Sequence, residues 1–185
     1  MSSVLQPLRL AALLGAALAA VPVYAQPSGN AVDIGQSVPD AKAVAEGLFP
    51  EDACEQLRQA GFKCMGFKPA VRYSLPATSF ALGSAELPDT LKTQLDVFAE
   101  VLKAKRGNGK PIRIEGHADA SGSPDFNLTL SAKRAEAVRD YLVRQGADAA
   151  LLETVGVGAH DLKNPADPYG AENRRVEIGR PAPPT

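Results

Sequence analysis

Residues 111–144 have the pattern of a strand, a tight turn and a long helix, and this stretch constrains the fold more than any other part of the chain. Apolar and polar residues alternate over 112–115, which predicts a short strand with one apolar face. Ser123 followed by Pro124 is typical of a helix start, with the serine as N-cap and the proline at the first helical position. Gly146 is expected to end the helix.

The predicted helix carries a polar stripe next to the end of the strand. Asn127, Ser131 and Arg134 stand at positions i, i+4 and i+7, so they share one face. Asp119 comes where the preceding strand ends. A carboxylate and a guanidinium held on rigid elements across a short gap can grip a ligand that has both an ammonium and a carboxylate, as an amino acid does.

Strands and helices alternate along the rest of the chain. Alternating residues predict a first strand over 78–82 and two later strands over 152–157 and 175–178. Leucines and a phenylalanine recur at helical spacing over 88–105, which indicates a helix with a core-facing stripe. This order predicts an α/β fold, and the one-sided strand pattern predicts that helices pack on one face of the sheet only.

The N-terminal residues are expected to direct export. Residues 1–25 contain an arginine, an apolar run of signal-peptide length and small residues before Gln26, as a cleaved signal peptide does. The run 26–36 lacks periodicity, which predicts a mobile tether. The expected organisation is a signal peptide at 1–25, a linker and small disulfide-pinned appendage at 26–70, the main domain at 71–180 and a tail at 181–185.

Export decides how the two cysteines are interpreted. Cys54 and Cys64 are ten residues apart, and in an oxidising compartment such a pair forms a disulfide more often than a metal site. The bridge would pin the second of two short helices in the appendage to the segment that follows it.

Net charge and motifs argue against two classes of function. The formal net charge is −1 and no basic run is present, whereas nucleic-acid binding depends on an excess of Lys and Arg. The glycine-containing stretches lack the spacing that cradles phosphates. We therefore expect neither a nucleic acid nor a nucleotide as partner.

Four motifs occur in a fixed order along the chain. They are a GHxD strand end at 116–119, the helix pattern N-x-x-LS-x-x-RA-x-x-V-x-x-YL at 127–142, a G-x-G at 156–158 and NRRV at 173–176. Over roughly residues 78–180 this pattern resembles the peptidoglycan-binding domain of the outer-membrane protein A (OmpA-like) family. The resemblance implies the OmpA-like fold, an α+β sandwich with a mixed β-sheet and helices packed on one face, and a non-enzymatic function without a cofactor.

The resemblance also implies a ligand and the residues that hold it. The ligand would be peptidoglycan, bound through the diaminopimelate of its stem peptide. Asp119 would receive the ammonium and Arg134 would clamp the carboxylate, with Asn127 and Arg174 lining the same pocket. The protein is then expected to be periplasmic or associated with the outer membrane, where it anchors to or senses the wall, with the appendage as a surface for an envelope protein.

Two other functions stay open at this level. Glu115, His117 and Asp119 share one strand face by alternation, so a metal-dependent wall hydrolase is one alternative. Zinc needs three or four ligands, however, and the only other histidine, His160, lies in a separate loop. The second alternative is a structural periplasmic interaction protein with a decayed pocket.

Overall fold

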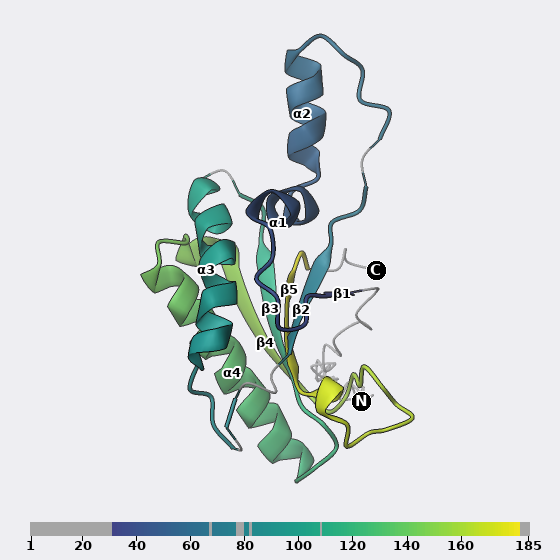
Figure 1. Ribbon diagram of the computed structural model, residues 1–185, viewed down its shortest axis with the longest axis vertical. Helices are drawn as coiled ribbons and strands as arrows, with labels where there is room; N and C mark the ends of the chain where they lie inside the picture. Colours follow the sequence, from purple (N-terminus) through teal and green to yellow (C-terminus); the bar gives the residue numbers. More distant parts are fainter. Residues whose placement is uncertain (1–30, 67, 77–79, 82, 108, 182–185) are drawn as a thin grey trace, which may run out of the picture.

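The computed structural model describes residues 31–66, 68–76, 80–81, 83–107 and 109–181 (Figure 1). The predicted signal peptide at 1–25 and the tail beyond residue 181 lie outside these residues. Of the helices in the described part of the chain, none is both long enough and apolar enough to cross a membrane.

One five-stranded mixed sheet organises the chain. Its strands, in the order in which they lie side by side, are β1 (Ala31–Asp33), β2 (Arg72–Pro76), β5 (Arg175–Gly179), β3 (Ile112–His117) and β4 (Leu152–Gly158). β1 pairs parallel with β2, and β3 pairs parallel with β4, whereas β5 runs antiparallel to both of its neighbours. The predicted mixed sheet is confirmed. Its central strand is β5, which pairs with β2 on one side and with β3 on the other.

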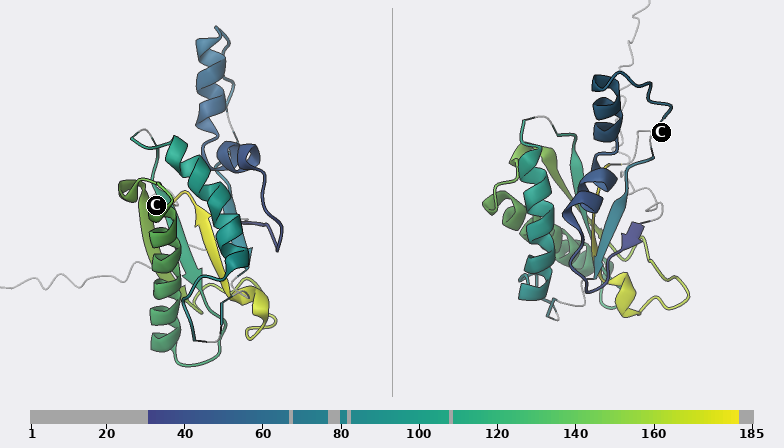
Figure 2. Two further views of the ribbon diagram at one scale, coloured as in Figure 1. Left: turned by 60° about the vertical axis from the view of Figure 1, so that its left-hand side comes forward. Right: turned by 45° about the horizontal axis from the view of Figure 1, so that its top comes forward.

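Two long helices, α3 (Asp89–Ala104) and α4 (Pro124–Arg144), cover one face of this sheet (Figure 1, Figure 2). The apolar stripe predicted for α3 is buried, and its members are Leu91, Leu95, Phe98 and Leu102. The same core holds the apolar residues of α4 and the sheet, among them Leu75, Ile112, Ile114, Val138, Leu142, Val176 and Ile178. Two short 3-10 helices, η2 (Ala149–Leu151) and η3 (Ala171–Asn173), precede β4 and β5.

Helix α4 begins where the sequence predicts and lies directly on the sheet. The Oγ of Ser123 accepts a hydrogen bond from the backbone N–H of Phe126 at 3.2 Å, which caps the helix. Gly116 of β3 faces the helix so closely that a Cβ there would lie 2.7 Å from the carbonyl carbon of Ser131 and closer still to its oxygen. Glycine is therefore required for this contact, which brings the first turns of α4 beside the end of β3.

The N-terminal region joins the body of the molecule. Residues 31–33 pair with β2, and Gln94 of α3 donates two hydrogen bonds to backbone carbonyls of the segment that follows β1. Helix α1 (Ala41–Leu48) buries Val44 and Leu48 in the core. The mobile tether predicted over 26–36 is therefore wrong from residue 31 onward, because this segment gains its order from a strand that is distant in the sequence.

The strand predicted over 78–82 lies mostly outside the described residues. The two described residues in that range, Phe80 and Ala81, are not in a strand. The strand that precedes α3 in the structure is β2, which ends at Pro76.

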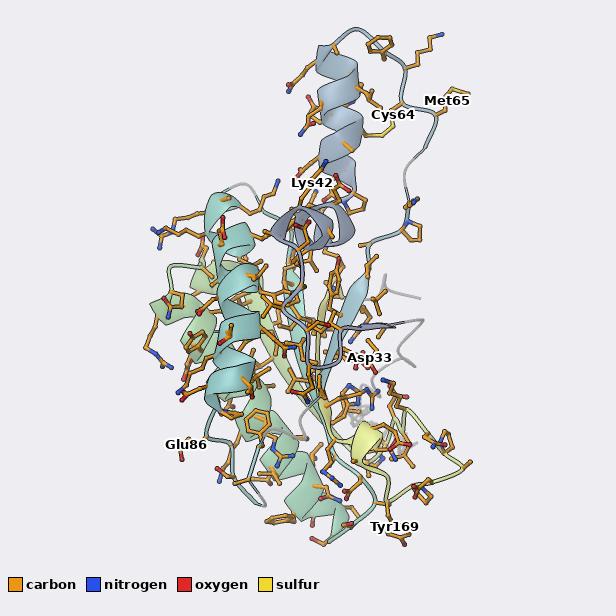
Figure 3. The ribbon with its side chains drawn as sticks, viewed as in Figure 1. Asp33, Lys42, Cys64, Met65, Glu86 and Tyr169 are labelled. Carbon is orange, nitrogen blue, oxygen red and sulfur yellow. A yellow bond between two sulfur atoms is a disulfide. The ribbon has the colours of Figure 1, made fainter. Side chains whose placement is uncertain are left out.

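Helix α2 (Glu51–Gln59) projects away from the body, and the chain returns beside it (Figure 1). Residues 51–70 are called the arm below. A disulfide joins Cys54 to Cys64, whose Cα atoms are 5.4 Å apart, and Figure 3 draws this bond in yellow. Within α2, Cys54 alone is buried, so the arm has little core of its own.

Candidate functional site

A pocket of about 560 Å³ opens where β3 ends and α4 begins. Its walls come from the loop after β3, the first three turns of α4, the segment before α3 and the residue before β5. The lining residues are Phe80, Gly83, Ala118, Asp119, Ser121, Gly122, Phe126, Asn127, Leu130, Arg134 and Arg174. The structure thus brings the four ligand contacts proposed from the sequence, at positions 119, 127, 134 and 174, to one pocket.

Asp119 supplies the negative charge of the pocket. One carboxylate oxygen accepts a hydrogen bond from the backbone N–H of Ser121 at 2.9 Å, and the other pairs with the Nη1 of Arg174. Burial raises the pKa of Asp119, but the hydrogen bonds from Arg174 and Ser121 outweigh it, so the pKa lies below its ordinary value. The carboxylate is therefore ionised at neutral pH.

Arg134 is a buried arginine that has no carboxylate within ion-pair distance among the residues that the structure describes. Its side chain is 3 % exposed, its Nε donates to the backbone oxygen of Ser84 at 3.0 Å, and its guanidinium stacks over the ring of Phe80 at 4.9 Å. Among the described residues, no carboxylate oxygen lies within 4.0 Å of its guanidinium, whereas the neighbouring Arg174 has Asp119. Burial, and then the charge of Arg174, lowers the pKa of Arg134, although a guanidinium stays charged in proteins.

The polar stripe of α4 has two different functions. The amide nitrogen of Asn127 donates to the backbone oxygens of Asp119 (3.0 Å) and Ser121 (2.6 Å), so it holds the turn while it lines the pocket. The Oγ of Ser131 instead accepts from the backbone N–H of Gly158 at 2.9 Å and is fully buried. Ser131 therefore joins helix to strand, and Asn127 shapes the loop that presents Asp119.

Sequence reasoning missed several walls of the pocket. The ring of Phe80 packs against the guanidinium of Arg134, and the backbone oxygen of Ser84 accepts a hydrogen bond from Arg134. Any residue type at position 84 would supply that oxygen. Leu130 also lines the pocket, together with Phe126 and Gly83. The helical spacing of Phe126 and Leu130 with Arg134 is the one signal that could have placed them there.

A second polar cluster contains two residues of the hydrolase alternative. His117 is fully buried, and its Nε2 lies 3.8 Å from Glu115 and 4.0 Å from Glu177. Within the described part of the chain, these three are the group whose ligand atoms could share a metal ion, and Asp119 is not among them. The ligand set of Glu115, His117 and Asp119 therefore does not assemble, because the loop after β3 turns Asp119 into the pocket.

This second cluster is already balanced in charge. Arg72 pairs with both Glu115 and Glu177, and the Nε of Arg175 donates to Glu177 at 2.6 Å. Burial, and then the charge of Arg175, lowers the pKa of His117 from 6.5 to about 4, so its ring is neutral at physiological pH. Two carboxylates and two guanidiniums cancel, so a divalent cation would enter with its charge uncompensated. The cluster fits a buried ion-pair network better than a metal centre.

Comparison with known proteins gives consistent matches to one family. The OmpA family model matches residues 79–177. The chain is 38% identical over 106 residues to the peptidoglycan-associated lipoprotein of Pseudomonas aeruginosa, covering 54% of this chain and 58% of that protein. It is 45% identical over 69 residues to the peptidoglycan-binding protein ArfA of Mycobacterium bovis, covering 36% of this chain and 21% of that protein. The chain thus spans less than two thirds of these relatives.

A solved structure supports the fold. The OmpA-like domain of FopA1 from Francisella tularensis superposes with a TM-score of 0.50 and 24% sequence identity, covering 62% of this chain and 75% of that one. At this identity the likeness concerns the arrangement of strands and helices.

Proposed function

The chain belongs to the OmpA family, whose model covers more than half of it, and from this premise we propose that it binds cell-wall peptidoglycan without enzymatic turnover. The contact is the diaminopimelate of the stem peptide, and binding anchors the protein to the wall, or senses the wall, in the periplasm. Relatives whose names state peptidoglycan association or binding support the wall as the ligand.

The observation that carries this proposal is the guanidinium of Arg134. A buried charge without a partner costs several kcal/mol, roughly, unless an opposite charge compensates it. No described carboxylate oxygen lies within 4.0 Å of this guanidinium, and the charge of Asp119 acts on it only at longer range, so an anionic group of the ligand is the natural partner. Two parallel hydrogen bonds to a carboxylate suit the planar guanidinium, because its Nε is already held by Ser84 and its geometry is fixed.

Asp119 then accepts the ammonium of the same amino acid. In the free protein, Arg174 occupies this carboxylate, and its side chain is 35% exposed. Arg174 can therefore move toward the solvent when an ammonium arrives, or it can share the carboxylate with the ammonium. Asn127 contributes by holding the backbone of the loop in the form that presents Asp119.

The affinity of one such site for a single stem peptide is expected to be weak. The ligand's ammonium must compete with Arg174 for the carboxylate of Asp119, and the ligand's charged groups lose their water on binding, which offsets much of the gain from each ion pair. The wall is a polymer with many stem peptides, so rebinding at high local concentration retains the protein without any further contact.

Co-sedimentation with purified sacculi tests the proposal. Asp119→Asn and Arg134→Met each remove one charge while keeping most of the side-chain volume, and both are expected to abolish binding. Arg139→Met is the matched control, because Arg139 lies on the same helix and also donates its Nε to a backbone oxygen, that of Leu152 at 3.2 Å. Thermal melting checks that each variant is folded. If both pocket variants sediment like Arg139→Met, the pocket assignment is wrong.

A ligand series tests the diaminopimelate contact separately. Within a stem tetrapeptide, diaminopimelate and lysine both keep a distal ammonium, but only diaminopimelate has a free carboxylate beside that ammonium for Arg134. Titration by NMR is expected to move the amides of the loop 118–123 with the diaminopimelate tetrapeptide and to leave them nearly unchanged with the lysine tetrapeptide. Equal responses to both would remove the role proposed for Arg134.

The hydrolase alternative makes a different prediction. A metal-dependent hydrolase would purify with bound zinc and cleave muropeptides, whereas the binding protein leaves them intact. Zinc content and muropeptide turnover measured on the same preparation separate the two functions.

A further inference from the structure

The end of the arm exposes large apolar side chains. Leu57 is 45% exposed, Phe62 is 64% exposed and Met65 is 93% exposed. The disulfide between Cys54 and Cys64 holds the return segment against α2, so these side chains are presented on a pinned loop. Exposed apolar side chains gathered at one place mark interaction sites more often than scattered ones do.

The arm and the pocket lie at opposite ends of the molecule. Figure 3 places Cys64 and Met65 at one end of its long axis and Tyr169 at the other. Tyr169 follows Pro168, whose backbone oxygen accepts a hydrogen bond from Ala120 in the pocket loop at 2.8 Å. A protein that holds the wall through its pocket would therefore direct the end of the arm away from that contact.

The charge of the arm is divided along its length. Its acidic residues are compensated near the base and along α2, since Glu51 pairs with Arg180, Asp52 with Lys105 and Glu55 with Arg58. Lys63 and Lys68 are exposed in the return segment, and no described carboxylate lies within 4.0 Å of either ammonium. The uncompensated charge beside Phe62 and Met65 is therefore positive.

We propose that the end of the arm docks on an anionic phospholipid membrane, with Phe62 and Met65 entering the interface and Lys63 and Lys68 contacting the headgroups. Apolar side chains beside lysines are the combination that binds such surfaces. A stable protein partner fits less well, because it requires roughly 20–30 interface residues on each side. Membrane insertion has no such minimum, since each side chain that leaves water contributes independently.

A tryptophan reporter tests the contact at its own position. The chain contains no tryptophan, so Phe62→Trp gives a single emitter on the arm. Tyr169→Trp is the matched control, because Tyr169 is 65% exposed, nearly the same as Phe62, and lies at the other end of the molecule. With vesicles of phosphatidylglycerol and phosphatidylcholine, emission from position 62 is expected to shift to shorter wavelength and to be quenched by brominated lipid, while position 169 stays unchanged. No shift at position 62, or equal shifts at both positions, would overturn the proposal.

Binding measurements separate the apolar and ionic contributions. The protein as purified after export is used, so that all variants share one N-terminus. Phe62→Ser combined with Met65→Ser is expected to lower the vesicle partition coefficient roughly tenfold, and Lys63→Gln combined with Lys68→Gln is expected to remove the preference for phosphatidylglycerol over pure phosphatidylcholine. The proposal is contradicted if the apolar double variant partitions to vesicles as the unmodified protein does. It is equally contradicted if the arm variants lose binding to an envelope protein while their binding to vesicles stays the same.

This inference stands apart from the wall-binding function. Asp119→Asn is expected to lose sacculus binding and to keep vesicle binding, whereas the arm variants are expected to do the reverse. Since the arm lies outside the core, the arm variants should have the same melting temperature as the unmodified protein.

Discussion

Substituting Gly116 by alanine should separate helix α4 from the sheet. A Cβ at this position would lie 2.7 Å from the carbonyl carbon of Ser131 and 3.2 Å from its Cα. These are backbone atoms of a helix that also rests on Gly156, where a Cβ would lie 2.7 Å from the Cβ of Ala132. Because the helix is held at two glycines, it cannot tilt away at one of them without loosening the other.

The expected loss of stability follows from this geometry. Adding a methyl group to a packed core costs about 1–3 kcal/mol where side chains can adjust, and a contact with backbone belongs at the upper end of that range. We expect about 3 kcal/mol, which lowers the melting temperature by roughly 6–12 °C for a domain of this size. Sacculus binding should also weaken, because Asn127 and Arg134 are carried by α4.

Urea and thermal unfolding of Gly116→Ala beside Gly107→Ala test this reasoning. Gly107 has φ of 80° and open space around its Cβ position, so its substitution strains the backbone, at about 1 kcal/mol, and meets no atoms. If Gly116→Ala is no less stable than Gly107→Ala, the close approach of α4 to β3 is not what fixes glycine there.

Three further predictions concern separate parts of the molecule. In the folded protein the pKa of His117 is lowered from 6.5 to about 4, so as the pH falls the unfolded chain takes up the proton first. The free energy of unfolding is therefore expected to fall by about 3 kcal/mol between pH 6.5 and pH 4. Urea unfolding at several pH values should show a smaller fall in His117→Leu, and equal falls in the two proteins would contradict the assignment. Replacing Cys54 and Cys64 by serine removes a disulfide to which the chain-entropy model assigns about 3 kcal/mol of stabilisation. Hydrogen exchange should become faster in α2, while the main melting transition changes little. A large fall in the temperature of that transition would mean that the arm is part of the core. Ser123→Ala removes the N-cap of α4 and should lower the free energy of unfolding by about 1 kcal/mol. The control Thr129→Ala, at an exposed position on the same helix, should leave it almost unchanged. Equal unfolding midpoints for the two variants would show that the cap contributes nothing.

The parts of the fold that could be predicted depend on local chemistry. The start of α4 follows from Ser123 and Pro124, since a cap and a fixed φ act within one turn of the chain. The apolar stripe of α3 follows from helical periodicity for the same reason. It was predictable that Asp119 and Arg134 would line the same pocket, because one short loop and three helical turns connect them.

The parts that could not be predicted depend on residues that are distant in the sequence. Glu115 and Glu177 occupy positions that strand alternation assigns to solvent, yet both are buried because Arg72 and Arg175 pair with them. Strand β1 forms only because β2 offers it an edge. Likewise, no local pattern indicates that Phe80 lies beneath Arg134.

The position of β5 in the sheet has a consequence for the order in which the chain can fold. Without β5, β1 and β2 form one pair and β3 and β4 form another, and no strand of the described residues joins the two pairs. The final segment joins them, and Arg174, directly before it, completes the pocket. The pocket is therefore complete only when the chain is available to fold through β5, so an earlier folding intermediate lacks one of its walls.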